Sequence, residues 1–249
     1  MFRLDEDILR CYFRLEEYQR QRIRMERLWH PEKMKWSGGI PQVSETKGIR
    51  REELAKMGFT EAYYQQMLQG ENEAYKEIER LVIHHPLWPH FERIKGLGHY
   101  LAGAFVAAGG DIQRPPTASA FWYGMGLDVL SDGTVPRRKR GLKDVERKVP
   151  ALPHVTRVGE QIRQQLLRSG GFAKGLYDKH KADYVLRYPD RPAMFAHKHG
   201  LRIAQKILYA CLWEKWREAY NLPAPWPYAF TILYHEPDHR ITIVDFYSK

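Results

Sequence analysis

The sequence is poor in cysteine and has no long hydrophobic run. Cys11 and Cys211 are its only cysteines. Two thiols so far apart in the chain make neither a disulfide framework nor, by themselves, a zinc site. No apolar stretch approaches the roughly 20 residues that span a bilayer. The first residues, MFRLDED, are acidic and lack the apolar core of a signal peptide. These absences argue against secreted and membrane proteins, so we expect a cytoplasmic location and no membrane partner.

Positive charge is in excess. Lys and Arg number 40 against 30 Asp and Glu, and the isoelectric point is about 9.5. Such an excess favours a polyanionic partner, nucleic acid more often than an anionic membrane, over a basic but inert surface. Because 43% of the residues are hydrophobic and 28% are charged, the 249-residue chain can bury a sizeable core in one large domain or two smaller ones.

The N-terminal region carries a heptad-like apolar pattern. Residues 4–28 favour a helix, because apolar side chains recur about every 3.5 residues, with Arg22 interrupting the pattern. These apolar positions are Leu4, Ile8, Cys11, Leu15, Tyr18 and Met25. The pattern fits both a helix that docks on its own chain and a short dimerising helix, and about three heptads are marginal for a coiled coil.

Helical signals dominate the rest of the chain. A Pro- and Gly-rich linker at 30–48 is followed by a candidate N-cap at Thr60 and a candidate helix break at Gly70. Helices are predicted at 49–57, 71–84, 99–108, 157–168, 172–187 and 191–220, and one more is capped by Thr117 or Ser119. The tail alternates on both sides of Glu236-Pro237-Asp238, which predicts a β-hairpin with one strand through 230–234 and the other through 241–245.

The stretch Ile94-Lys95-Gly96-Leu97-Gly98, between two helical segments, has the form of a helix-hairpin-helix. Glycine permits a tight turn and a close approach of another backbone. The N–H groups of Gly96, Gly98 and His99, at the start of the next helix, would then face a phosphate oxygen. The stretch predicts binding to the DNA backbone, while an ordinary helix–helix turn fits the same five residues.

Together these signals predict a mainly α fold, with a helix-hairpin-helix inside a multi-helix domain and a small C-terminal β-hairpin. The predicted divisions are an N-terminal helix and linker (1–48), a helical region with the hairpin (49–127), a basic irregular segment (128–156), a C-terminal helical region (157–222) and a β-hairpin tail (223–249).

An ordered series of motifs follows the hairpin. The series comprises Gly110-Asp111-Ile112, Arg114, the helix from Thr117 to Met125, Gly126-Leu127, then Gly159, Arg163 and Leu166, and finally Ala204, Lys206, Ile207 and Leu208. In this order, residues 90–215 resemble the C-terminal region of the bridge-RNA-guided insertion-sequence transposases, which are recombinases. The resemblance implies a DNA-binding module followed by a transposase domain that carries a serine.

The chain departs from that family in its front half. The family's RuvC-like domain brings four metal-binding carboxylates together from distant strands, whereas residues 1–85 show helical periodicity. The resemblance therefore implies a C-terminal module without the RuvC-like domain. The nearest candidate for the family's catalytic serine is Ser131, where Asp132 interrupts the usual serine–glycine pair. Ser131-Asp132-Gly133 is also a favourable turn sequence, and a turn is the simpler interpretation.

A basic segment follows Ser131. We expect it to contact phosphates, while a solvated loop with no such role is the alternative. The predicted DNA-binding residues are Arg93, Lys95, Gly96, Gly98, His99, Arg114, Arg137, Arg138, Lys139, Arg140, Lys143 and Arg163. Histidines two residues apart on a helix, such as His197 and His199, do not share a face, and no cysteine accompanies them at zinc spacing. We predict no metal site and no cofactor.

The sequence thus predicts a DNA-binding protein of transposase or recombinase type, nucleoid-associated or otherwise DNA-associated, that acts in recombination or transposition. Double-stranded or branched DNA is the expected partner, and RNA, a homodimer and a larger nucleoprotein complex are further candidates. Two alternatives stay open. One is an enzyme, a serine-nucleophile recombinase completed by a partner that brings carboxylates. The other is a structural assembly protein with no DNA chemistry.

Overall fold

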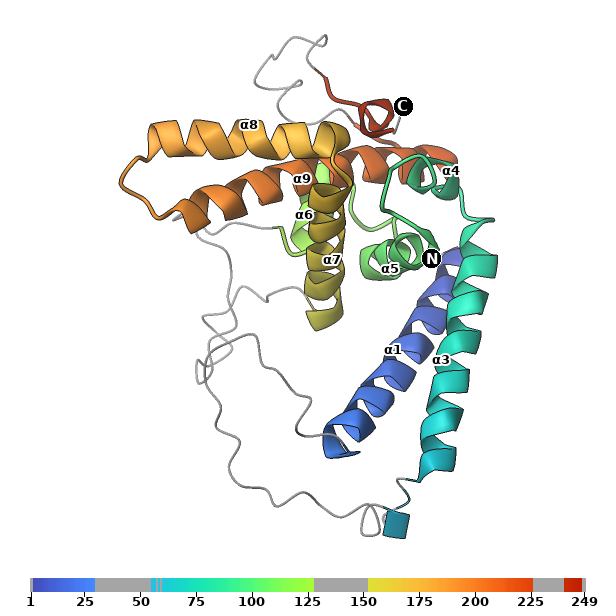
Figure 1. The fold of residues 1–249 in the computed structure, drawn as a ribbon. Coiled ribbons are helices and arrows are strands. Elements are labelled where there is room, and N and C mark those ends of the chain that lie inside the picture. Colours follow the sequence, from blue (N-terminus) through green and yellow to red (C-terminus); the bar gives the residue numbers. More distant parts are fainter. Residues whose placement is uncertain are drawn as a thin grey trace, which may run out of the picture. The chain divides into compact units, whose positions relative to one another are not determined.

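The computed structural model describes residues 2–29, 55–56, 58, 60–127, 152–225 and 240–247, which are mainly helical (Figure 1). The elements are α1 (Arg3–Trp29), α3 (Glu61–Val82), α4 (Trp88–Phe91), α5 (His99–Gly109), α6 (Ala118–Gly124), α7 (Pro153–Ser169), α8 (Gly171–Arg187), α9 (Ala193–Ala219) and the 3-10 helix η4 (Ile243–Phe246). These bounds confirm the helices predicted at 4–28, 99–108, 157–168, 172–187 and 191–220. The chain forms two compact units, Arg10–Arg80 and Met1–Leu9 with Leu81–Lys249.

The Arg10–Arg80 unit is an antiparallel pair made by α1 and α3. Of the predicted apolar positions in this unit, Leu15 and Met25 are buried, whereas Cys11 and Tyr18 are half-buried. Tyr12, which the pattern did not include, is buried as well. Where Arg22 interrupts the apolar pattern, its Nε donates to Glu71 of α3 at 2.6 Å and its Nη1 donates to Glu26 at 2.5 Å. The polar interruption is therefore paired, and this part of α1 packs on its own chain.

Helix α3 begins at the predicted cap but does not break at Gly70. The Thr60 hydroxyl accepts a hydrogen bond from the Tyr63 N–H at 3.2 Å. The prediction that Gly70 would divide the helix is wrong, because α3 runs without interruption from Glu61 to Val82. A Cβ at Gly70 would lie 2.5 Å from the ring of Tyr18, so glycine is needed here for close packing between two helices.

Helix α5 forms the centre of the second unit. Seven consecutive residues, 101–107, are buried. A helix that is apolar on every side is buried on every side, and the small residues of α5 allow neighbours to come close. The Phe105 ring contacts Phe91, Tyr209 and Trp216 at centroid distances of 5.4, 5.1 and 6.1 Å. The aromatic residues Tyr209, Trp213 and Trp216 of α9 therefore belong to the core.

Around this centre, α8 and α9 run side by side in opposite directions, and α7 runs across them (Figure 1). Helix α7 also contacts α5. Helix α6 packs on α9 and starts at Thr117, whose hydroxyl accepts from the Ala120 N–H at 3.2 Å. Of the two predicted caps, Thr117 is the one that is used.

The prediction of a second strand at 241–245, in the C-terminal β-hairpin, is wrong. Residues 243–246 form the 3-10 helix η4, and no strand occurs within the described ranges. The Asp245 carboxylate accepts from the Thr242 N–H at 2.7 Å and from its hydroxyl at 3.0 Å, which closes a helical turn. Ile243 and Phe246 are both buried, a three-residue spacing that suits a helix. The expected first strand, at 230–234, lies outside the described residues.

Candidate nucleic-acid interface

The turn between α4 and α5 is held from the inside by apolar residues. Phe91, Ile94 and Leu97 are buried. The N–H of Ile94 donates to the Phe91 carbonyl at 3.0 Å, and the N–H of Leu97 donates to the Ile94 carbonyl at 3.1 Å. These contacts place the residues between the apolar anchors, Lys95 and Gly96, on the surface.

Gly96 meets two separate requirements of this turn. Its φ of +89° lies in the left-handed region, which side-chain-bearing residues rarely adopt. A Cβ on Gly96 would also lie 3.3 Å from the Cβ of Ser169 and 3.6 Å from that of Gln165. The turn is therefore pressed against the last turn of α7, which fixes its position.

Gly98 forms the N-cap of α5 and offers no side chain to cap the first turn. A Cβ at this position would meet no atom within 4 Å, so the space beside the helix start is open. The partial positive charge of the helix dipole is concentrated at this end. The His99 ring stacks on Trp88 at a centroid distance of 4.2 Å.

Positive charge collects near the turn. Arg93 and Lys95 are exposed, and the Arg93 guanidinium lies 5.2 Å from the centre of the Tyr247 ring. Burial lowers the pKa of His90 from its ordinary value, and the cations of Lys215 and Arg93 lower it further. His90 is thus partly shielded from water and lies in an electropositive environment.

A second glycine turn lies beside the first. Gly170 and Gly171 both have positive φ, +74° and +72°, and connect α7 to the start of α8. Ser169, the residue before them, is the one that faces Gly96. Arg168 is exposed at the same end of α7. Arg168 was not predicted from the sequence, because α7 and the turn are far apart in the chain and meet only in the folded unit, where Gly96 lies against Ser169.

Other predicted site residues do not converge on the turn. Arg114 follows the end of α5 opposite Gly98, and α5 is about 16 Å long. The Arg114 side chain is 86% exposed and lies 3.6 Å from Asp111. Arg163 donates to Gln205 at 2.9 Å and also pairs with Glu160, so its guanidinium is occupied within the unit. Ser131, Arg137, Arg138, Lys139, Arg140 and Lys143 lie outside the described residues.

The first arm of the expected helix-hairpin-helix is short. Helix α4 has four residues, whereas α5 has 11. The glycine turn and the second helix are therefore present, but the assignment of the whole as a helix-hairpin-helix stays a prediction.

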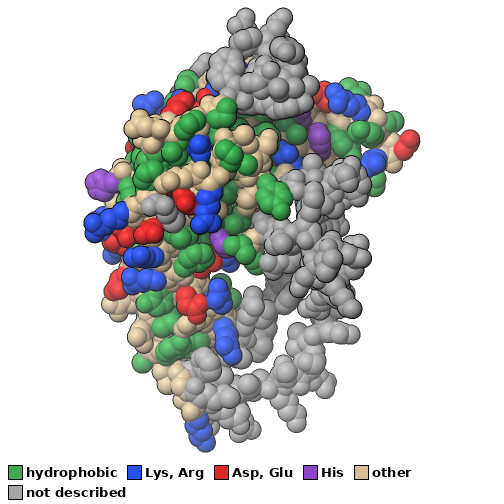
Figure 2. Space-filling view, turned by 180° about the vertical axis from the view of Figure 1, so that it is seen from behind, with side chains coloured by type: hydrophobic (Ala, Val, Ile, Leu, Met, Phe, Trp, Pro, Cys, Tyr) green, Lys and Arg blue, Asp and Glu red, His purple; other side chains and the backbone are tan. Residues whose placement is uncertain are grey.

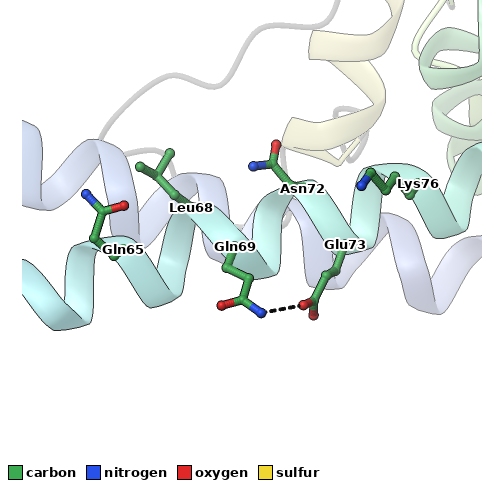
Figure 3. A pocket seen from close by; sticks show the side chains of 6 residues that line it. All are labelled: Gln65, Leu68, Gln69, Asn72, Glu73 and Lys76. Atoms are coloured by element: carbon green, nitrogen blue, oxygen red, sulfur yellow. Dashed lines mark hydrogen bonds between the residues drawn. The ribbon is translucent and has the colours of Figure 1, made fainter.

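Other features of the described chain do not form a chemical site. The shallow depression in Figure 3 is lined by side chains of α3 alone: Gln65, Leu68, Gln69, Asn72, Glu73 and Lys76. Gln69 donates to Glu73 there at 2.8 Å. Across the described residues, no three His, Cys, Asp or Glu side chains are placed to hold a metal ion. None of the helices described is both long and apolar enough to cross a bilayer.

Comparison with known proteins found no matching family model, curated protein or solved structure.

Proposed function

We propose that this protein binds double-stranded or branched DNA through the phosphate backbone at the α4–α5 turn. The main support for this proposal is the Gly96 turn. Buried Ile94 and Leu97 anchor it, α7 packs against it, and the space beside Gly98 is open. A rigid, open backbone turn at the positive end of a helix suits an anion such as a phosphate oxygen.

The side chains around the turn would add charge without reading base edges. Arg93, Lys95 and Arg168 are exposed at this end of the unit and can approach neighbouring phosphates. Such contacts position a protein on the duplex but carry no sequence information. We therefore expect affinity that changes little with DNA sequence and falls steeply with salt.

The resemblance of residues 90–215 to transposase C-terminal regions gives this binding a role in recombination or transposition. In that role, the protein would hold DNA within a nucleoprotein complex. Ser131 remains the candidate nucleophile if the chain also cuts DNA. Binding is the proposal that the described residues support, since the turn and its charges belong to them.

A salt titration with a 20-base-pair duplex tests the proposal. Three phosphate contacts would give a slope of log Kd against log salt of about 2.7, or roughly a 40-fold loss of affinity between 50 and 200 mM salt. Lys95→Gln should weaken binding about tenfold at low salt and reduce the slope by about 1. Lys76→Gln, which removes an exposed lysine from α3, is the matched control and should leave both values unchanged.

Equal effects of the two substitutions would show that the basic surface as a whole, and not the turn, attracts DNA. A flat salt response, or no binding at 50 mM salt, would remove the phosphate model. Concentration-dependent self-association without any DNA binding would instead favour the assembly alternative. A covalent protein–DNA adduct that forms with branched DNA and disappears in Ser131→Ala would favour the enzyme.

A further inference from the structure

A strip of aromatic rings lies at the end of the α8–α9 pair where the two helices are joined. We call it the aromatic strip: Tyr184 and Tyr188 from α8 and its C-cap, and Phe195 and His199 from α9. Tyr184 contacts Tyr188 and His199, each at a centroid distance of 4.8 Å. Tyr184 and Tyr188 are four residues apart, as are Phe195 and His199, so the two rings of each segment follow one another along one side.

The outer rings of the strip are open to solvent. Tyr188 and Phe195 are each 48% exposed, which is high for large hydrophobic side chains. The neighbouring Leu186 and Met194 are 80% and 56% exposed. In the view from behind, hydrophobic side chains lie among Lys, Arg and His at the upper right, where this end of the pair is seen (Figure 2). A contiguous exposed apolar surface of this kind indicates a binding site.

Cations surround the aromatic strip. The guanidinium of Arg191 lies over the rings of both Tyr188 and Phe195, 5.5 and 5.8 Å from their centres. Residues 179–202 contain six Lys or Arg but only two Asp. Burial lowers the pKa of His199, and the charges of His180, Arg187 and Arg202 lower it further, as expected in an electropositive environment. The partner of this surface should therefore be anionic.

The connection between the helices keeps the strip in place. The loop Tyr188-Pro189-Asp190-Arg191-Pro192 contains two prolines, which restrict its backbone. The N–H of Arg191 donates to the Tyr188 carbonyl at 3.1 Å. Earlier on α8, the Tyr177 hydroxyl lies 2.7 Å from Nδ1 of His197 and joins α8 to α9. The rings thus belong to a preformed surface.

We propose that the aromatic strip binds single-stranded nucleic acid by stacking unpaired bases on Tyr188 and Phe195. Unpaired nucleic acid combines flat apolar faces with a negative backbone, which matches exposed rings surrounded by cations. Arg191 would contribute its planar guanidinium to the stack or pair with a phosphate. A second copy of this chain fits less well, since a symmetric contact would bring the same positive surfaces together.

This inference deepens the proposed function and rests on it for the class of ligand. A protein that holds branched DNA meets unpaired bases where strands separate. The α4–α5 turn would hold the duplex, and the aromatic strip would hold the unpaired strand. The two sites use different residues, so each can be removed separately.

The test uses the full chain, a 12-nucleotide strand of thymidines carrying one 2-aminopurine, and the 20-base-pair duplex. Tyr188→Ala with Phe195→Ala should weaken strand binding at least about tenfold, because stacking on one ring contributes roughly fivefold or more. The change removes no charge, so the salt slope of strand binding should stay the same. Arg191→Gln should lower that slope by about 0.7. Duplex binding should be unchanged in the double variant.

A conservative variant separates loss of stacking from loss of structure. Tyr188→Phe with Phe195→Tyr keeps both rings and should retain strand affinity and the quenching of 2-aminopurine that stacking produces. Loss of affinity in this variant, or normal affinity and quenching in the alanine variant, would overturn the inference. Displacement of the strand by polyglutamate at equal charge concentration would also overturn it, because the site would then recognise charge and not bases.

The failure of this inference differs from a failure of the proposed function. If the aromatic strip is not a stacking site, duplex binding still depends on Lys95, but the affinity for the single strand is the same with and without the rings of Tyr188 and Phe195. If the proposed function fails, Lys95→Gln and Lys76→Gln behave alike toward the duplex.

Discussion

At the scale of single residues, two glycines of the α8–α9 pair lie in opposite surroundings. A Cβ on Gly200 would lie 2.7 Å from the backbone oxygen of Tyr177, whereas a Cβ on Gly175 would meet no atom within 4 Å. Gly200→Ala should therefore destabilise the protein by about 1–3 kcal/mol, because the two helices must move apart. Gly175→Ala should instead stabilise it by about 0.5–1 kcal/mol through helix propensity.

Urea unfolding followed by circular dichroism measures both free energies of unfolding. Gly175→Ala is the matched control, because it makes the same replacement in a helix without the close contact. Equal effects in the two variants would show that helix propensity alone decides, and that α8 and α9 do not approach as closely as the Gly200 contact requires.

The sequence predicted some single-residue roles and missed others for one physical reason. Thr117 and Thr60 were found as caps because a cap depends on N–H groups only a few residues away. Gly70 was misinterpreted because its partner, the Tyr18 ring, is 52 positions away in the chain and belongs to another helix. Gly96 was selected as a turn residue, but the contact with Ser169 that positions the turn could not be predicted.

At the scale of elements, the connection from α5 to α6 is fastened to the end of α9 by one buried arginine. The Nη1 of Arg217 donates to the carbonyls of Ile112 and Pro115 at 2.8 and 3.1 Å, and its Nε donates to the Pro223 carbonyl at 2.6 Å. Because Arg217 is buried, Arg217→Met would take this donor from the Ile112 and Pro223 carbonyls, while the Pro115 carbonyl keeps a hydrogen bond from Nε1 of Trp213 at 3.1 Å. We expect a loss of about 3 kcal/mol in the free energy of unfolding.

Arg20→Met provides the comparison, since Arg20 is exposed and its ion pair among the described residues is with Glu17, one turn away. Its effect should stay within about 0.5 kcal/mol. Faster amide exchange at residues 110–117 in Arg217→Met, and not in Arg20→Met, would localise the effect to the connection. A loss below about 1 kcal/mol would indicate that water replaces the arginine at these carbonyls.

Elements with a clear apolar period were predicted well, and the element without one was not. The helices α1, α7, α8 and α9 are each long enough to show the period, whereas α5 is apolar on every side and was predicted from its run of small apolar residues between glycines. The tail has only a few alternating apolar residues, Phe230, Ile232 and Tyr234 before the turn sequence and Ile241 and Ile243 after it. The part after the turn fits a strand as well as a helical turn. The hydrogen bonds between Thr242 and Asp245 decide in favour of the 3-10 helix η4.

At the scale of the whole molecule, composition predicted a helical chain with a basic surface but not the places where charge gathers. Asp5 illustrates the limit. Its Oδ1 lies 3.0 Å from Nε2 of His85 and accepts from the Tyr220 hydroxyl at 2.7 Å, which joins the first turn of α1 to residues far along the chain. Such pairings depend on packing, so the aromatic strip and the contact between the Gly96 turn and Ser169 of α7 became visible only in three dimensions.

The pH dependence of stability is the property of the whole molecule that the histidines control. Burial lowers the pKa of His180 and of His199 below 6.5, and the nearby cation of Arg187 lowers both further. Between 6.5 and the lower values of the folded state, the unfolded chain binds more protons, so the free energy of unfolding falls as the pH falls. Above pH 6.5 both states carry neutral imidazoles and the effect is absent.

The hydrogen bond from Arg80 lowers the pKa of Glu77 from 4.5, so the stability from this carboxylate is lost only at still lower pH. Urea midpoints should therefore drop as the pH falls below 6.5, and His180→Gln with His199→Gln should reduce that drop while leaving the loss below pH 4.5 in place. An equal drop in both proteins would assign the acid sensitivity to other groups.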